Sequence, residues 1–252
     1  MNILLDTTIQ IDRITGSKER IEKVNAVLEG NDLYCTTYVL GEYYNNIIND
    51  FIALFSLFLT YKDIGETGKH ITENLFGRRQ ARVSKLYANI ISAADSNLGE
   101  MEDVFRLQLD ILQESFYSKI QDVIDKTGCA RAKTEIVYED GIPVLTPPIS
   151  CRKREEKCDI CQLWRDSIEE IDRIIADGKV SDRILKILNS AKEDESNYRG
   201  QNCMALGDII ICLEALKDSK EMAVCSSNKS DFKPICDLLG IELVVPDYSF
   251  KK

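Results

Sequence analysis

The chain has 252 residues, of which 44% are hydrophobic and 29% are charged. This composition is typical of a folded globular protein and excludes a mainly disordered chain. The 42 acidic and 32 basic side chains give a formal net charge of -10, which argues against a protein that coats nucleic acid through a general positive field.

The longest apolar run, Phe51 to Tyr61, is about half as long as the roughly 20 residues that a membrane-spanning helix needs. The N-terminal segment has no basic stretch and meets an acid at Asp6, unlike a secretory signal or a transit peptide. We therefore expect no membrane span and a cytoplasmic location.

The first 62 residues predict alternating strands and helices. Residues 2–5 and 33–36 are short apolar runs typical of buried strands, and one amphipathic helix is expected between them. A second helix is expected from Tyr38 towards Tyr61.

The last part of the chain repeats this alternation. A helix is expected from Asp208, a strand over 222–226, a helix over 231–239 and a last strand over 241–245. Such alternation is typical of a parallel sheet flanked by helices. The sequence thus predicts an α/β domain built from residues 1–62 and 198–252.

The residues between these segments, 63–197, predict a large and mainly helical insertion. Apolar periodicity indicates helices over 81–95, 101–125, 163–176 and 181–195. Runs of β-branched residues around an Asp-Gly pair indicate a β-hairpin within residues 134–148.

Several polar side chains follow the strands of the predicted sheet, where open parallel sheets bind their ligands. These candidate site residues are Asp6, Glu42, Asp208, Asn228 and Asp231. Taken singly, most have an ordinary interpretation as a helix N-cap or a solvated helix position. Taken together, clustered carboxylates repel one another and favour a bound cation that neutralises them.

Magnesium or manganese fits such a site best, because both ions prefer oxygen ligands. One or two of these ions can activate a water molecule and stabilise the charge that develops on a phosphodiester. The pattern therefore predicts hydrolytic nuclease chemistry.

Four segments carry these residues in chain order: ILLDTTIQID, TTYVLGEYYNNI, CMALGDIIICLEA and VCSSNKSDF. Together they resemble the PIN-domain ribonuclease family. In that family an acid ends the first strand, a Glu lies on the helix after the second, an Asp opens a late helix, and a polar residue follows the fourth strand. The resemblance implies a PIN-like α/β fold and a Mg²⁺- or Mn²⁺-dependent endoribonuclease, with Asp6, Glu42 and Asp208 as metal ligands.

The chain departs from that family in two places. Residues 226–228 read Ser-Ser-Asn, where the family commonly has Thr, any residue and Asp, and the interval before the third segment is far longer than in compact members. Two alternatives for the fourth site residue follow: Asn228 could bind a metal through its amide oxygen, or Asp231 could replace it. Thr7 or Ser226 is expected to orient the ligands by hydrogen bonds.

An alternative function is a catalytically inactive PIN-like scaffold that docks RNA or protein. Phe51, Phe55 and Phe58 lie near the insertion and could build a homodimer interface or a partner groove. An RNA substrate would need a local basic patch, for which Arg78–Lys85 is the best candidate. A second basic run, residues 152–157, is diluted by two acids.

Nine cysteines in a chain without a signal peptide indicate reduced thiols rather than a disulfide framework. Five of them lie in apolar surroundings and are expected to be small buried hydrophobic residues: Cys35, Cys203, Cys212, Cys225 and Cys236.

The other four cysteines suggest a structural zinc site. If Tyr138 pairs with Ile142 in the hairpin, the same ladder places Cys129 opposite Cys151. The remaining pair is Cys158 and Cys161, a C-x-x-C that could complete a tetrahedral site. Free structural cysteines and a redox pair are the alternatives.

Overall fold

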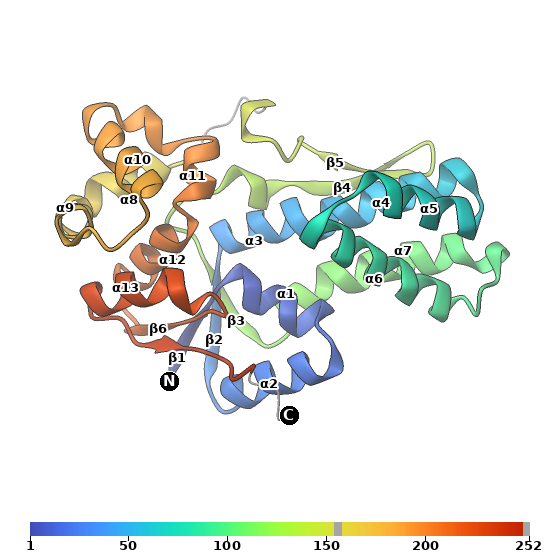
Figure 1. Ribbon diagram of the computed structural model, residues 1–252, viewed down its shortest axis with the longest axis horizontal. Helices are drawn as coiled ribbons and strands as arrows, with labels where there is room; N and C mark the ends of the chain where they lie inside the picture. The colour runs from blue at the N-terminus through green and yellow to red at the C-terminus, as the bar shows by residue number, and fades with distance from the viewer. Residues whose placement is uncertain (154–157, 249–252) are drawn as a thin grey trace. The chain divides into compact units, whose positions relative to one another are not determined.

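The computed structural model of the chain describes residues 1–153 and 158–248 (Figure 1). Contacts within the structure divide the chain into two compact units. The first unit comprises Met1–Tyr43, Lys119–Lys133 and Ser150–Lys252, and the second comprises Tyr44–Ser118 and Thr134–Ile149. The sequence placed these boundaries elsewhere, with one insertion over residues 63–197.

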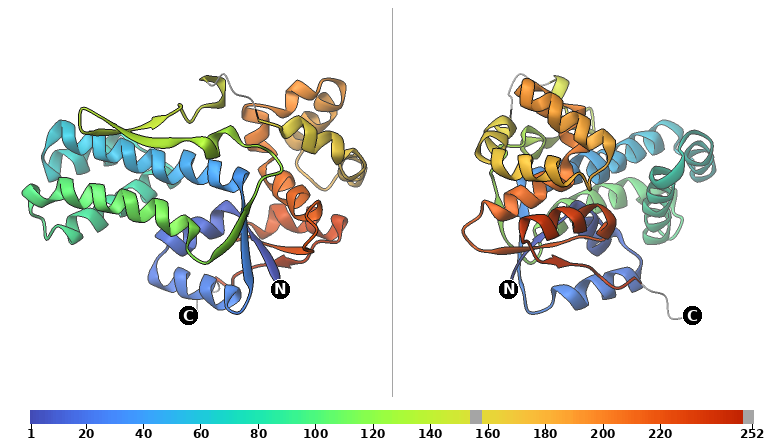
Figure 2. Two further views of the ribbon diagram at one scale, coloured as in Figure 1. Left: turned by 180° about the vertical axis from the view of Figure 1, so that it is seen from behind. Right: turned by 60° about the vertical axis from the view of Figure 1, so that its left-hand side comes forward.

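A five-stranded parallel sheet forms the centre of the first unit (Figures 1 and 2). Its strands, in spatial order, are β3 (Ile120–Ile124), β2 (Asp32–Thr36), β1 (Asn2–Leu5), β6 (Met222–Cys225) and β7 (Leu243–Val244). Every neighbouring pair is parallel. The side chains of residues 3–5 are completely buried in β1, as expected for a strand covered on both faces. The predicted α/β fold is confirmed at this level.

Helices flank this sheet and account for most of the remaining residues of the first unit. In chain order they are α1 (Thr7–Thr15), α2 (Lys18–Leu28), α3 (Thr37–Tyr43), α8 (Ile160–Asp166), α9 (Ile168–Asp177), α10 (Asp182–Glu193), α11 (Gln201–Ala205), α12 (Gly207–Leu216) and α13 (Lys229–Leu239). The single helix predicted between the first two strands is wrong. The chain forms α1 and α2 because Ser17 starts a new helix, with its Oγ accepting a hydrogen bond from the Arg20 amide at 3.3 Å.

The strand β3 corrects a second prediction. The helix expected over 101–125 ends earlier, as α7 (Leu98–Tyr117), and Lys119 then takes a left-handed φ of 63°. A non-glycine residue in that conformation ends a helix. The next five residues form β3, which pairs with β2 at the edge of the sheet, so part of the predicted insertion belongs to the first unit.

The second unit is a helical bundle with one β-hairpin. A short π-helical segment, η1 (Tyr44–Ile48), leads into α4 (Asn49–Tyr61), and the bundle continues with α5 (Ile64–Asn74), α6 (Gly77–Ala93) and α7. The hairpin strands are β4 (Glu135–Glu139) and β5 (Ile142–Thr146), and the views in Figures 1 and 2 show them running along α4.

The hairpin itself is confirmed, but its predicted register is wrong by one residue. Glu139 pairs with Ile142, and Tyr138 pairs with Pro143. Asp140 and Gly141 both have positive φ, 50° and 83°, which gives the two-residue turn typical of tight hairpins. The ladder ends at Glu135 and Thr146, so it does not extend to the cysteines on either side.

The phenylalanines proposed as a partner surface belong to the core of the second unit. Phe51, Phe55 and Phe58 are 1%, 0% and 3% exposed. Their rings surround Phe105 of α7, with ring centroids 5.6, 4.8 and 5.2 Å from that of Phe105. Such packing supplies hydrophobic and aromatic stabilisation within the bundle, so these side chains cannot form an exposed dimer face.

Candidate functional site

The candidate acid site lies at the carboxyl ends of β1 and β6, in the first unit. Strands β2 and β3 lie on one side of β1 within the sheet, and strands β6 and β7 lie on its other side. The two strands are joined in register, with Leu5 opposite Cys225 and the Asp6 amide donating to the Cys225 carbonyl at 2.9 Å. This is the topological switch point, where parallel sheets of this kind bind ligands.

Asp6 follows β1 directly and occupies the N-cap position of α1. It is 4% exposed, and its Oδ2 accepts hydrogen bonds from Thr8 Oγ1 at 2.6 Å and from Ser226 Oγ at 2.8 Å. Burial raises the pKa of the Asp6 carboxyl, and these two hydroxyl donors lower it again in part. The hydroxyls therefore fix the orientation of a buried acid whose charge is poorly solvated.

Glu42 is half-buried on α3 and is held by two hydroxyl groups. Thr7 Oγ1 donates to its Oε2 at 2.6 Å, and the Tyr38 hydroxyl donates to its Oε1 at 3.1 Å. Burial is the largest cause that raises the pKa of Glu42, and the negative charge of Asp6 raises it further. Tyr38 lies one helical turn before Glu42 on the same face of α3, a spacing that could have identified it from sequence.

Asp208 lies in the first turn of α12 and is half-buried. Burial, together with the charges of Asp6, Asp231 and Glu42, raises its pKa to about 7. The preceding residue must be glycine, because a Cβ on Gly207 would lie 2.8 Å from the Tyr38 hydroxyl. The close approach of α12 to α3 thus brings Asp208 within electrostatic range of the other acids.

Asn228 and Asp231 complete this rim of the site at the start of α13. The Asn228 amide nitrogen donates to Asp231 Oδ2 at 2.7 Å and lies 3.5 Å from Asp208 Oδ2. Asn228 is half-buried, whereas Asp231 is exposed. With its amino group directed at two carboxylates, Asn228 acts here as a hydrogen-bond donor, and Asp231 supplies the rim oxygen atoms.

The chemistry of this donor set suits a hard divalent cation. Four carboxyl groups lie at the carboxyl ends of the strands, and three of them have raised pKa values. A bound cation would reduce their mutual repulsion. In residues 1–153 and 158–248, no group of three or more His, Cys, Asp or Glu side chains already converges on a single metal position. Binding would therefore require the carboxylates to rotate towards the ion.

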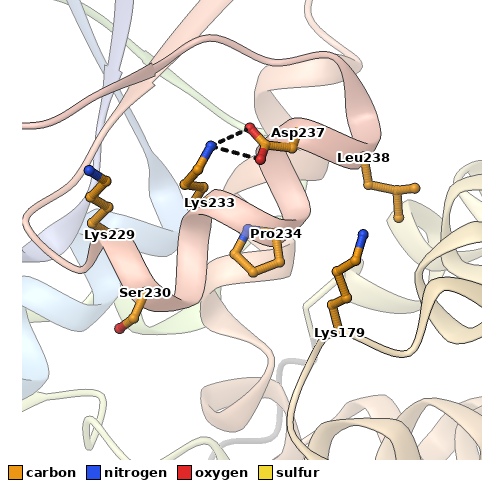
Figure 3. A pocket seen from close by; sticks show the side chains of 7 residues that line it. All are labelled: Lys179, Lys229, Ser230, Lys233, Pro234, Asp237 and Leu238. Atoms are coloured by element: carbon orange, nitrogen blue, oxygen red, sulfur yellow. Dashed lines mark hydrogen bonds and ion pairs between the residues drawn. The ribbon is translucent and has the colours of Figure 1, made fainter.

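A hollow of about 880 Å³ lies beside α13, close in sequence to the acid site (Figure 3). Lys179, Lys229 and Lys233 line it together with the apolar side chains of Pro234 and Leu238. Lys233 forms an ion pair with Asp237 at 2.8 Å across one turn of the helix. Lys229 directly follows Asn228, so this positive side of α13 adjoins the rim of the acid site.

The basic run Arg78–Lys85 lies at the start of α6 in the second unit, and two of its cations bind an acid of the same unit. Arg79 Nε lies 2.8 Å from Asp50 Oδ1, and Arg82 Nε lies 3.0 Å from Asp50 Oδ2. Asp50 is only 4% exposed, so both arginines stabilise a buried carboxylate. The second basic run includes residues 154–157, which lie outside the described residues.

The predicted zinc ligands are brought together only in part. Burial raises the pKa of the Cys203 thiol, the thiols of Cys129, Cys158 and Cys151 raise it further, and the Arg131 guanidinium lowers it. Cys161 instead donates from its Sγ to the Glu195 carbonyl at 3.4 Å. The structure therefore groups Cys203, which the sequence placed among the buried hydrophobic cysteines, with three of the four predicted ligands.

Comparisons with known proteins add no assignment to this geometry: no family model, no curated protein and no solved structure matches the chain. Among the described residues, no helix is both long enough and apolar enough to cross a membrane.

Proposed function

We propose that the chain is a metal-dependent endoribonuclease of the PIN type, which hydrolyses RNA phosphodiester bonds at the acid site. The observation that carries this proposal is the concentration of negative charge at the switch point. Burial together with the charges of Asp6, Asp231 and Glu42 raises the pKa of Asp208 to about 7. A bound divalent cation would neutralise these carboxylates and relieve their repulsion, which favours its binding at this site.

Asp6, Glu42 and Asp208 are the residues that would hold Mg²⁺ or Mn²⁺. When bound, such an ion supplies Lewis-acid chemistry: it lowers the pKa of a coordinated water and stabilises negative charge on the phosphate. Thr7 and Ser226 hold the carboxylates of Glu42 and Asp6 through the hydrogen bonds described above, and they keep those oxygen atoms oriented.

At the rim, Asn228 and Asp231 form a hydrogen-bonded pair next to Asp208. In the proposed reaction Asp231 accepts a hydrogen bond from the attacking water and Asn228 holds Asp231 in place. The lysines beside α13 supply positive charge for the flanking phosphates of the RNA, which an overall charge of -10 would otherwise repel.

The test is cleavage of a fluorescent, unstructured RNA in the presence of Mn²⁺. We expect the wild type to cleave it and Asp208→Asn to be slower by about 100-fold or more, because one charged ligand of the metal is lost. Asp110→Asn, the same change at an exposed acid of α7, is the matched control and should leave cleavage unchanged. Equal cleavage by wild type and Asp208→Asn would refute the proposal.

A second candidate function, the catalytically inactive scaffold, is favoured by one observation. Asn228 stands where the resembling family has an acid, and its amide nitrogen already satisfies Asp231 at 2.7 Å. An amide in that place reduces the negative charge available to a metal. A chain that folds normally, binds RNA and takes up neither Mg²⁺ nor Mn²⁺ would support this function instead.

A further inference from the structure

A buried arginine of the first unit packs against α3, and its terminal nitrogens lack hydrogen-bond partners in the part of the chain that the structure describes. Arg131 is 3% exposed, and neither terminal nitrogen of its guanidinium has a hydrogen-bond partner among the described residues. The guanidinium carbon lies 5.3 Å from the centroid of the Tyr38 ring. Burying a guanidinium in this way is costly: the Glu42 carboxylate interacts with it electrostatically, but its terminal nitrogens still need hydrogen-bond acceptors.

Hydrogen bonds to the backbone hold the segments of three cysteines, Cys129, Cys158 and Cys203, near Arg131 and Tyr38. The Asp159 amide donates to the Thr127 carbonyl at 2.8 Å, which holds the segment of Cys158 beside that of Cys129. The Tyr38 hydroxyl lies 3.2 Å from the Cys203 carbonyl and donates to it, which holds α11 against the same tyrosine.

The side chains also influence one another electrostatically. The thiols of Cys129, Cys151 and Cys158 each interact with that of Cys203, and Arg131 interacts with both Cys129 and Cys203. The packing is close: a Cβ added to the neighbouring glycine, Gly41, would lie 2.9 Å from Cys129 Sγ and 2.8 Å from Arg131 Cβ.

We propose that Cys129, Cys151, Cys158 and Cys203 bind one structural zinc ion, and that Arg131 donates hydrogen bonds to the zinc-bound sulfur atoms. Four thiolates around Zn²⁺ leave two negative charges in excess, and their sulfur atoms would supply the hydrogen-bond acceptors that the terminal nitrogens of Arg131 lack among the described residues. The four thiols do not yet converge on one metal position. Rotation about χ1 moves each Sγ without moving the backbone, and we expect such rotations to bring the four sulfur atoms to the zinc ion.

This site shares no residue with the acid site and does not depend on the proposed function, although Arg131 interacts electrostatically with Glu42. Arg131 and Cys129 pack against Gly41, the residue before Glu42, so zinc at this position would brace the helix that carries Glu42. The site would thus stabilise the first unit, as closed structural zinc sites do.

The test measures zinc per chain by mass spectrometry of the metal in protein purified from zinc-supplemented cells under reducing conditions. We expect about one zinc per chain for the wild type and almost none for Cys203→Ser, because a tetrathiolate site needs all four sulfurs. Cys161→Ser is the matched control and should retain zinc, since the Cys161 thiol is bonded to the Glu195 carbonyl. Asp208→Asn should retain it too, which excludes zinc held by the acid site.

A second measurement on the wild type covers the case in which Cys203→Ser does not fold. After zinc removal and re-addition, alkylation should show that zinc protects Cys129, Cys151, Cys158 and Cys203 together and leaves the labelling of Cys161 unchanged. The proposal is overturned if the wild type takes up no zinc, if Cys161→Ser loses zinc while Cys203→Ser keeps it, or if zinc protects a different set of thiols.

Discussion

Asp208→Asn should make the protein more stable at high pH, although it removes a residue of the candidate site. The pKa of Asp208 is about 7 in the folded chain, against 3.8 for an ordinary aspartate. This difference is about 3 pH units, and at about 1.4 kcal/mol per unit it corresponds to about 4 kcal/mol as an upper value. We expect about 2–4 kcal/mol, because relaxation around a half-buried group reduces the penalty.

The sign follows from proton binding. Between about pH 4 and pH 7, the folded chain keeps the Asp208 proton that the unfolded chain has lost, so the wild type loses stability as the pH rises through this window. The amide side chain of the variant does not titrate and does not repel Asp6 or Glu42. The stability difference between Asp208→Asn and wild type should therefore be small near pH 4 and reach its full value near pH 8.

The assay is urea unfolding at several pH values with a chelator present, for wild type, Asp208→Asn and the exposed control Asp110→Asn. Other buried acids also titrate, so the informative quantity is the difference between variant and wild type at each pH. Parallel pH profiles for wild type and Asp208→Asn would refute the reasoning, because they would mean that burial and the neighbouring charges do not raise the pKa of Asp208. In the same assay without chelator, saturating Mn²⁺ should stabilise the wild type at pH 8 and have little effect on Asp208→Asn.

Three further changes test other parts of the structure. Gly41→Ala should lower the free energy of unfolding by about 1–3 kcal/mol, because its Cβ would lie 2.8 Å from Arg131 Cβ; unchanged urea unfolding would contradict this packing. Asp50→Asn should cost about 1–3 kcal/mol by weakening the charge-assisted bonds to two arginines, and high salt should reduce the difference if the reasoning holds. The free energy of unfolding of Glu214→Gln should rise relative to that of the wild type between about pH 5 and about pH 9, because burial raises the pKa of this fully buried acid to about 8. A difference in urea unfolding that does not change with pH would contradict this expectation.

The parallel sheet could be predicted because its strands are short apolar runs joined by amphipathic helices. Residues 2–5 and 222–225 are almost entirely buried, so their composition directly reflects the β-sheet core. Strand β3 could not be found in this way, because two of its five residues are exposed and it lies at the sheet edge next to a long helix. Its polar residues continue the helical pattern of polar and apolar residues in α7, so the sequence does not indicate where that helix ends.

The acid site could be located from sequence because carboxyl ends of parallel strands meet at one edge, whatever the length of the connections. Most of the hydroxyl groups that hydrogen-bond to Asp6 and Glu42 lie at the start of α1 or directly after β6, so some of these hydrogen bonds could also be expected from the sequence. The proximity of Cys203 to Arg131 could not be predicted, because these two residues come close through tertiary packing alone. No residue spacing links these two positions, and the assumed hairpin register favoured a different set.

The most direct test of the central claim is a calorimetric titration of Mn²⁺ into the purified protein, beside Asp208→Asn and Asp110→Asn. It requires no knowledge of the RNA substrate. The account predicts binding by the wild type and the Asp110→Asn control, and loss of binding in Asp208→Asn, because Asp208 is one of the three proposed carboxylate ligands. No binding by the wild type, or equal binding by Asp208→Asn, would contradict the assignment of the acid site as a metal site.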